Sequence, residues 1–146
     1  MAVKFFTKEE QEKIVSAIKK AEINTSGEIQ VHLENKCKND VMVRAKEVFT
    51  SLGISKTNLK NGVLFYLAVI DHKFAILGDE GINNLVPSNF WDEIKNDMQA
   101  KFKQKQFCDG ICEGILAAGH QLKKHFPYLD NDKNEISDEI SFGSQE

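Results

Sequence analysis

Hydrophobic and polar residues alternate along the chain with two different periods, and each change of period marks an expected element. Residues 7–23 place apolar side chains at helical spacing behind Thr7, which forms the pattern of a capping box with Glu10. Residues 28–34 alternate strictly between polar and apolar, which is typical of a strand with one apolar face. The chain is therefore predicted to start with a helix and a strand that has one apolar face.

The middle of the chain predicts another helix and a strand hairpin. Asp40, or the residue before it, is expected to begin the second helix. Residues 63–70 form an unbroken apolar run, which indicates a central strand that is covered on both faces. A tight turn then leads into residues 73–77, which read as another strand, so the two strands are expected to pair in antiparallel fashion.

Two further helices complete the expected fold. Ser88 is expected to cap a third helix, and residues 109–125 predict a last helix that Pro127 ends. Because a helix joins the first two strands, these are expected to be parallel and linked by a right-handed crossover. The predicted fold class is α/β, a three-layer αβα sandwich with a small mixed central sheet of three to four strands.

Charge divides the 146 residues into a body and an acidic tail. The net charge of the whole chain is −3, whereas residues 130–146 contain six acids and one lysine and so carry −5. We expect residues 1–129 to form one αβα domain, and the tail to be disordered because it has few apolar side chains to offset ordering entropy. The near-neutral body has no basic footprint, which argues against nucleic-acid binding.

The cysteines and the apolar runs of the sequence indicate the cellular compartment of the protein. No apolar run approaches the length of a membrane span, and no signal peptide is evident, so we expect a cytoplasmic monomer whose thiols are reduced. These thiols are Cys37, Cys108 and Cys112. The last two lie four residues apart on a predicted helix, where buried core thiols and a soft-metal or redox pair are both open readings. His32, on the polar face of its strand, has no evident serine or cysteine partner.

Polar side chains gather at one end of the predicted sheet. With the first two strands parallel and the third antiparallel, the starts of the first two strands and the exit of the third lie together. Carboxylate and amide oxygens are ligands for calcium, and the absence of histidine and cysteine from both loops disfavours zinc and copper. An ordinary set of turn residues is the other open reading. The residues are Glu28, Asn58, Asn61, Asp79, Glu80, Asn83 and Asn84.

Four segments occur in an order that resembles the TPM domain family. They are TSGEI at residues 25–29, NGVLFYLAV at 61–69, LGDEGIN at 77–83 and FCDGICEGI at 107–115. The likeness covers about residues 5–127. It implies an αβα fold with two crossing loops, here residues 53–62 and 78–88, at which some members bind divalent cations, calcium included.

The resemblance implies a function as well as a fold. The expected function is a divalent-metal-binding regulatory or interaction module that takes Ca2+, or alternatively Mg2+, with a protein partner as a further expectation. A plant thylakoid member is described as an acid phosphatase, so a weak metal-dependent phosphomonoesterase and a structural partner-binding domain are the alternatives. Where many members have a glutamate, this chain has Asn83. The expected metal ligands are Glu28, Asn61, Asp79, Glu80 and Asn83.

Overall fold

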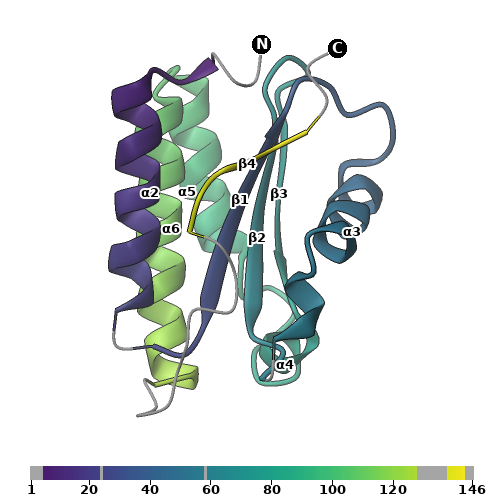
Figure 1. Ribbon diagram of the computed structural model, residues 1–146, viewed down its shortest axis with the longest axis vertical. Helices are drawn as coiled ribbons and strands as arrows, with labels where there is room; N and C mark the ends of the chain where they lie inside the picture. The colour runs from purple at the N-terminus through teal and green to yellow at the C-terminus, as the bar shows by residue number, and fades with distance from the viewer. Residues whose placement is uncertain (1–4, 24, 58, 128–137, 144–146) are drawn as a thin grey trace.

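The computed structural model of the protein describes residues 5–23, 25–57, 59–127 and 138–143. Helices α2, α5 and α6 cover one face of a four-stranded sheet, and helix α3 covers the other face (Figure 1). This is the predicted three-layer αβα sandwich. The elements are, in chain order, α2 (Lys8–Glu22), β1 (Glu28–Glu34), α3 (Val41–Ser51), the 3-10 helix η1 (Ile54–Lys56), β2 (Gly62–Ala68), β3 (Lys73–Gly78), α4 (Glu80–Asn83), α5 (Asp92–Lys103), α6 (Phe107–His125) and β4 (Ser141–Phe142).

The sheet has the strand order β3-β2-β1-β4. Strands β1 and β2 are parallel, and β2 and β3 form an antiparallel hairpin, as the sequence predicts. The mixed sheet follows from the connections, because a helix links the parallel pair whereas a tight turn links the antiparallel pair.

Helix starts follow the predicted capping residues in two cases and depart from them in a third. The Thr7 hydroxyl accepts a hydrogen bond from the Glu10 N–H at 3.1 Å, and Glu10 Oε1 accepts one from the Thr7 N–H at 3.0 Å. Asp40 caps α3 by accepting from two amides of its first turn. The prediction for Ser88 is wrong, because turns follow this residue and α5 begins only at Asp92.

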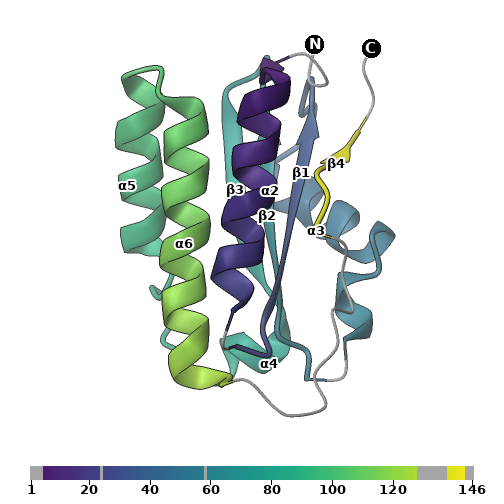
Figure 2. The ribbon, with the colours of Figure 1, turned by 60° about the vertical axis from the view of Figure 1, so that its left-hand side comes forward.

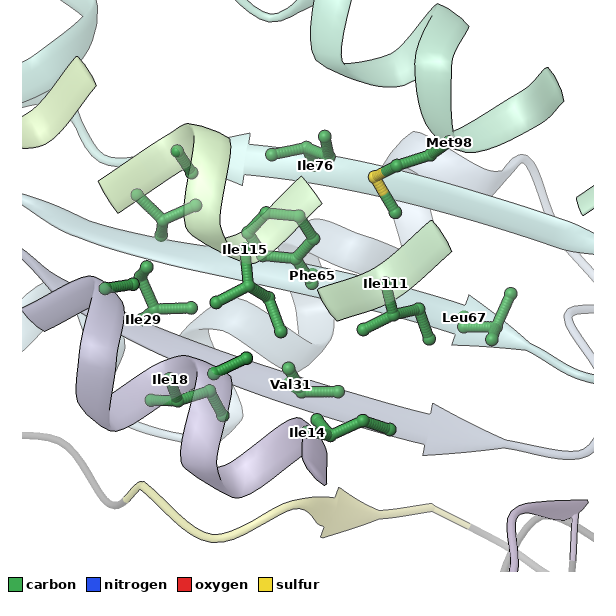
Figure 3. Packing of buried hydrophobic residues seen from close by; sticks show 14 of the residues in the cluster. Ile14, Ile18, Ile29, Val31, Phe65, Leu67, Ile76, Met98, Ile111 and Ile115 are labelled. Atoms are coloured by element: carbon green, nitrogen blue, oxygen red, sulfur yellow. The ribbon is translucent and has the colours of Figure 1, made fainter. Parts of the chain in front are cut away.

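The main hydrophobic core lies between the sheet and the three helices on one face. Figure 3 shows how side chains from α2 and α6 interdigitate with those of β1 and β2 in this layer. A smaller core lies under α3 on the other face. The labelled residues of the main core include Ile14, Ile18, Val31, Phe65, Ile111 and Ile115, all of which are buried.

Strand β1 is buried on both faces, although its alternating sequence makes only one of them apolar. Its polar side chains Gln30, His32 and Glu34 are only 5%, 5% and 3% exposed. Hydrogen bonds within the protein satisfy these polar groups, so the alternation here reflects a polar layer inside the fold.

The prediction of a disordered tail is wrong for residues 138–143. Two of these residues form β4, which pairs in parallel with β1. The physical reason is that Ile140 and Phe142, two isolated apolar residues in an acidic segment, pack against the main core. Residues 130–137 and 144–146 lie outside the described part of the chain.

The three cysteines have free thiols. Cys37 and Cys108 are buried, and Cys112 is half-buried. Burial raises the pKa of the Cys108 thiol, and burial together with Cys108 raises the pKa of Cys112 to about 12. These properties fit the core-thiol reading, since the thiolate is the reactive form. Of the helices that the structure describes, none has the length and apolar character needed to cross a bilayer.

Candidate metal-binding site at the crossing loops

Three strand ends meet at one end of the sheet, as the predicted topology requires. Glu28 at the start of β1 pairs in register with Gly62 at the start of β2. Val63, the next residue of β2, pairs with Gly78 at the end of β3. The loops that precede β2 and follow β3 are therefore brought side by side, and α4 lies at this end of the molecule (Figure 2).

Backbone hydrogen bonds join the two loops directly. The Asp79 N–H donates to the Gly62 carbonyl at 3.0 Å, and the Gly81 N–H donates to the Lys60 carbonyl at 2.8 Å. A Cβ atom on Gly81 would lie 2.3 Å from the carbonyl oxygen of Leu59 and 2.5 Å from that of Lys60. Only glycine permits this approach, so the two loops cross in close contact.

Asp79 holds the start of the short helix α4 with one carboxylate oxygen. Its Oδ1 atom accepts a hydrogen bond from the Glu80 N–H at 2.7 Å. Its Oδ2 atom is buried and accepts no hydrogen bond from any residue that the structure describes. The hydroxyl of Thr57, in the other loop, is likewise buried and unpaired within the described residues. Buried polar atoms of this kind call for an explanation, such as a bound water or ion.

Two further predicted ligands are buried at the same end of the sheet. Glu28 is 4% exposed, and its backbone N–H donates to the Asn61 carbonyl at 3.4 Å. Asn61 is 1% exposed, and its side-chain N–H donates to the hydroxyl of Ser26 at 3.4 Å. The side-chain oxygen of Asn61 is not used in that bond and stays a possible metal ligand.

Three further predicted residues lie on the second loop, in α4 or directly after it. Glu80, Asn83 and Asn84 are exposed. The side-chain N–H of Asn83 donates to the Gly78 carbonyl at 3.0 Å, so this residue also fixes the exit of β3. Asn58 lies outside the described residues. Within the described ranges, no three histidine, cysteine or acidic residues come together as a metal-binding group. A cation at the crossing loops would therefore need amide, hydroxyl, carbonyl or water oxygens as well.

The structure also contains a half-buried carboxyl pair that the sequence did not predict, Glu22 and Asp138. Burial, then a hydrogen bond with Asp138, raises the pKa of Glu22 to about 9, and the nearby charges of Asp138 and Glu28 add to the rise. Glu22 also accepts a hydrogen bond from the Ile29 N–H at 2.9 Å. A negative charge in the last turn of a helix interacts unfavourably with the helix dipole. The position of Glu22 at the end of its helix was therefore a sequence signal that could have pointed to this pair.

A second polar cluster lies on the α3 side of β1. Glu34 accepts hydrogen bonds from Nε and Nη2 of Arg44, at 2.8 Å each, and from the Tyr66 hydroxyl. His32 contacts Glu34 through Nε2 at 3.1 Å. Burial would raise the pKa of Glu34, but the hydrogen bonds from Arg44, Tyr66 and His32 outweigh it and hold that pKa at about 2.

His32 has a serine partner that the sequence did not suggest. Its Nδ1 lies 2.9 Å from the hydroxyl of Ser141, which belongs to β4. Burial lowers the pKa of His32, and the hydrogen bond with Glu34 only partly opposes this. The contact joins β4 to β1, and 109 residues of sequence separate its two members.

The comparisons with known proteins identify the family. Residues 2–121 match the TPM domain family. The NMR structure of the BA42 protein from the psychrophilic bacterium Bizionia argentinensis is 48% identical to this chain, with a TM-score of 0.90 over 96% of this chain and 97% of that protein. Among proteins with curated descriptions, none matches significantly.

Two more distant structures share the fold. The N-terminal domain of a protein from P. gingivalis is 16% identical, with a TM-score of 0.68 over 86% of this chain and 84% of that domain. The N-terminal domain of the cg2496 protein from Corynebacterium glutamicum is 13% identical, with a TM-score of 0.64 over 81% of this chain and 74% of that domain. The fold, the ordered motifs and the family match agree, and the chain belongs to the TPM domain family.

Proposed function

We propose that this protein binds a divalent cation, Ca2+ or alternatively Mg2+, where its two loops cross. The observation that carries the proposal is the buried Oδ2 atom of Asp79, which accepts no hydrogen bond from the described residues. A buried carboxylate oxygen without a donor is costly, and a bound cation removes that cost. The crossing is also close, so the cation would act on both loops at once.

The ligand set would combine side-chain oxygens with carbonyls and water. Calcium takes 6–8 oxygen ligands, which can be carboxylates, backbone carbonyls, side-chain amide oxygens and water. Glu28 and Asn61 are buried at the same end of the sheet as Asp79, whereas Glu80 and Asn83 would approach from the solvent side. Because Asn83 uses its N–H on Gly78, its oxygen is the ligand atom. Cation binding would fix the two loops relative to each other, which suits a regulatory or interaction module.

Calcium titration of the Asp79→Asn variant tests this proposal. Asparagine keeps an oxygen that can accept from the Glu80 N–H, so α4 retains its cap. We expect calcium affinity to fall at least about tenfold, or about 1.4 kcal/mol, with the apo fold intact. Asp97→Asn, at an exposed position of α5, is the matched control and should keep wild-type affinity. Backbone amide shifts during titration, with reversal by EDTA, measure the binding.

Thermal unfolding gives an independent measurement. A ligand at a hundredfold excess over its Kd stabilises the folded state by about 2.7 kcal/mol. Calcium should therefore raise the Tm of the wild type, and this effect should fade below about pH 4, where free carboxylates protonate. No Tm shift at millimolar calcium, or wild-type affinity in Asp79→Asn, would exclude the site. If a metal-dependent phosphomonoesterase activity were lost in that variant, the phosphatase alternative would replace this proposal.

A further inference from the structure

The C-terminal segment of residues 138–143 lies along the outer edge of β1 (Figures 1 and 2). Its strand β4 pairs in parallel with β1 over two residues only, with Ser141 opposite His32 and Phe142 opposite Leu33. The Gly143 N–H donates to the Leu33 carbonyl at 2.7 Å. The sheet thus gains a strand by the geometry with which sheet edges bind extended peptides.

Successive side chains of this segment contact different layers of the protein. Ser141 bonds His32 on the α3 side of the sheet. Ile140 and Phe142 instead pack on the main core and, with Val15 of α2, line a groove of about 530 Å³ between α2 and β4. Alternation of this kind is how a sheet edge distinguishes one extended sequence from another.

Two contacts add to the specificity of this edge. The side-chain N–H of Gln30 donates to the Glu139 carbonyl at 2.9 Å, which fixes the register ahead of β4. A Cβ atom on Gly143 would lie 2.3 Å from Glu34 Oε1 and 2.9 Å from His32 Nε2. Glu34 is held in place by Arg44 at 2.8 Å, so it has little freedom to move aside. The edge therefore favours glycine at this position, because a larger residue would overpack the contact.

Strand β1 and the segment that pairs with it are buried to very different extents. All seven residues of β1 are buried, whereas residues 138–143 are half-buried or exposed. The segment covers a surface of the domain without being enclosed by it, and a two-residue ladder is short for a strand. Such a strand can detach while the rest of the sheet stays paired.

We propose that the outer edge of β1 is a peptide-recognition site that the protein's own C-terminal segment occupies. The partner is an extended segment of another protein that runs parallel to β1 and carries a large apolar residue, serine, an aromatic residue and glycine in that order. It binds by displacing residues 138–143, and the tethered segment acts as a competing ligand.

The test uses the Gly143→Ala variant of the 146-residue chain and a blocked peptide of residues 138–143, Asp-Glu-Ile-Ser-Phe-Gly. The substitution excludes the protein's own segment from the edge and leaves β1 unchanged. We expect a folded variant that binds the peptide with amide shifts along β1. The wild type should bind about tenfold or more weakly, because its tethered segment competes at a high effective concentration. A control peptide ending in alanine should also bind about tenfold or more weakly, because its methyl group overpacks the site.

Each other outcome overturns the proposal. A Gly143→Ala protein that does not fold would make β4 an integral strand that no partner displaces. A folded variant that does not bind the glycine peptide would show that the edge is no recognition site. Equal binding of the glycine and alanine peptides, or equal binding by variant and wild type, would place the peptide elsewhere on the protein.

Discussion

Replacing Gly81 with alanine tests whether the two loops cross as closely as the structure shows. Gly81 is the second residue of α4, and helix propensity alone favours alanine over glycine by up to about 1 kcal/mol. The tertiary structure instead predicts that alanine at this position destabilises the protein. The new Cβ atom would lie 2.3 Å from the carbonyl oxygen of Leu59 and 2.5 Å from that of Lys60, and both are backbone atoms of the other loop.

The expected loss of stability follows from the separation of the two loops that the alanine side chain would force. The loops have to separate, which breaks the 2.8 Å hydrogen bond from the Gly81 N–H to the Lys60 carbonyl. Losing such a bond costs about 1 kcal/mol, and overpacking a close contact costs about 1–3 kcal/mol. After subtraction of the gain in helix propensity, we expect the free energy of unfolding to fall by about 2 kcal/mol. For a chain of this length that lowers the Tm by about 6 °C.

Urea and thermal unfolding of the apo protein measure this change, and Gly53→Ala is the control. Gly53 has a φ of +74°, but a Cβ atom there would come no closer than 3.8 Å to the Lys56 side chain. The free energy of unfolding of that variant should fall by only about 1 kcal/mol, which is the cost of placing alanine in a left-handed backbone conformation. Amide shifts at Lys60 and Asp79 should change in Gly81→Ala and not in the control. A Gly81→Ala protein as stable as the wild type would refute the close crossing.

The shifted pKa values of two carboxyl groups predict opposite changes of folding stability with pH. The pKa of Glu22 is about 9 in the folded protein and 4.5 ordinarily, so its contribution is fully present below pH 4.5 and is lost as pH rises toward 9. In urea unfolding, the stability of Glu22→Gln relative to wild type should therefore increase between pH 5 and pH 9. A constant difference would contradict the half-buried pair. The pKa of Glu34 is about 2, so its contribution is present above pH 4.5 and is lost as pH falls toward 2. Glu34→Gln should be destabilised at pH 7, and the gap to wild type should narrow in acid; a gap that widens there would be inconsistent with the Arg44 contact.

Local patterns in the sequence were enough to predict most of the layered fold. The capping residues Thr7 and Asp40 mark helix starts by hydrogen bonds to amides two or three residues away. The unbroken apolar run of β2 identifies a strand covered on both faces. These signals are local in the chain, and the pairing of β1, β2 and β3 follows from them through the lengths of the connections.

The sequence also placed Glu28, Asn61 and Asp79 at one end of the sheet, because strand direction alone decides which ends meet. It did not predict that the Asp79 side chain is partly buried and caps α4, since burial depends on the other loop. The requirement for glycine at position 81 arises in the same way. It comes from two carbonyl groups about twenty residues earlier in the chain.

Only the tertiary structure decided the role of the C-terminal segment. A two-residue strand has no period to detect, and its acidic surroundings by themselves favour disorder. What orders it is the edge of β1, where His32 and Gln30 offer hydrogen bonds and the core accepts Phe142. These contacts join residues more than a hundred positions apart, and local sequence carries no information about such distant pairs.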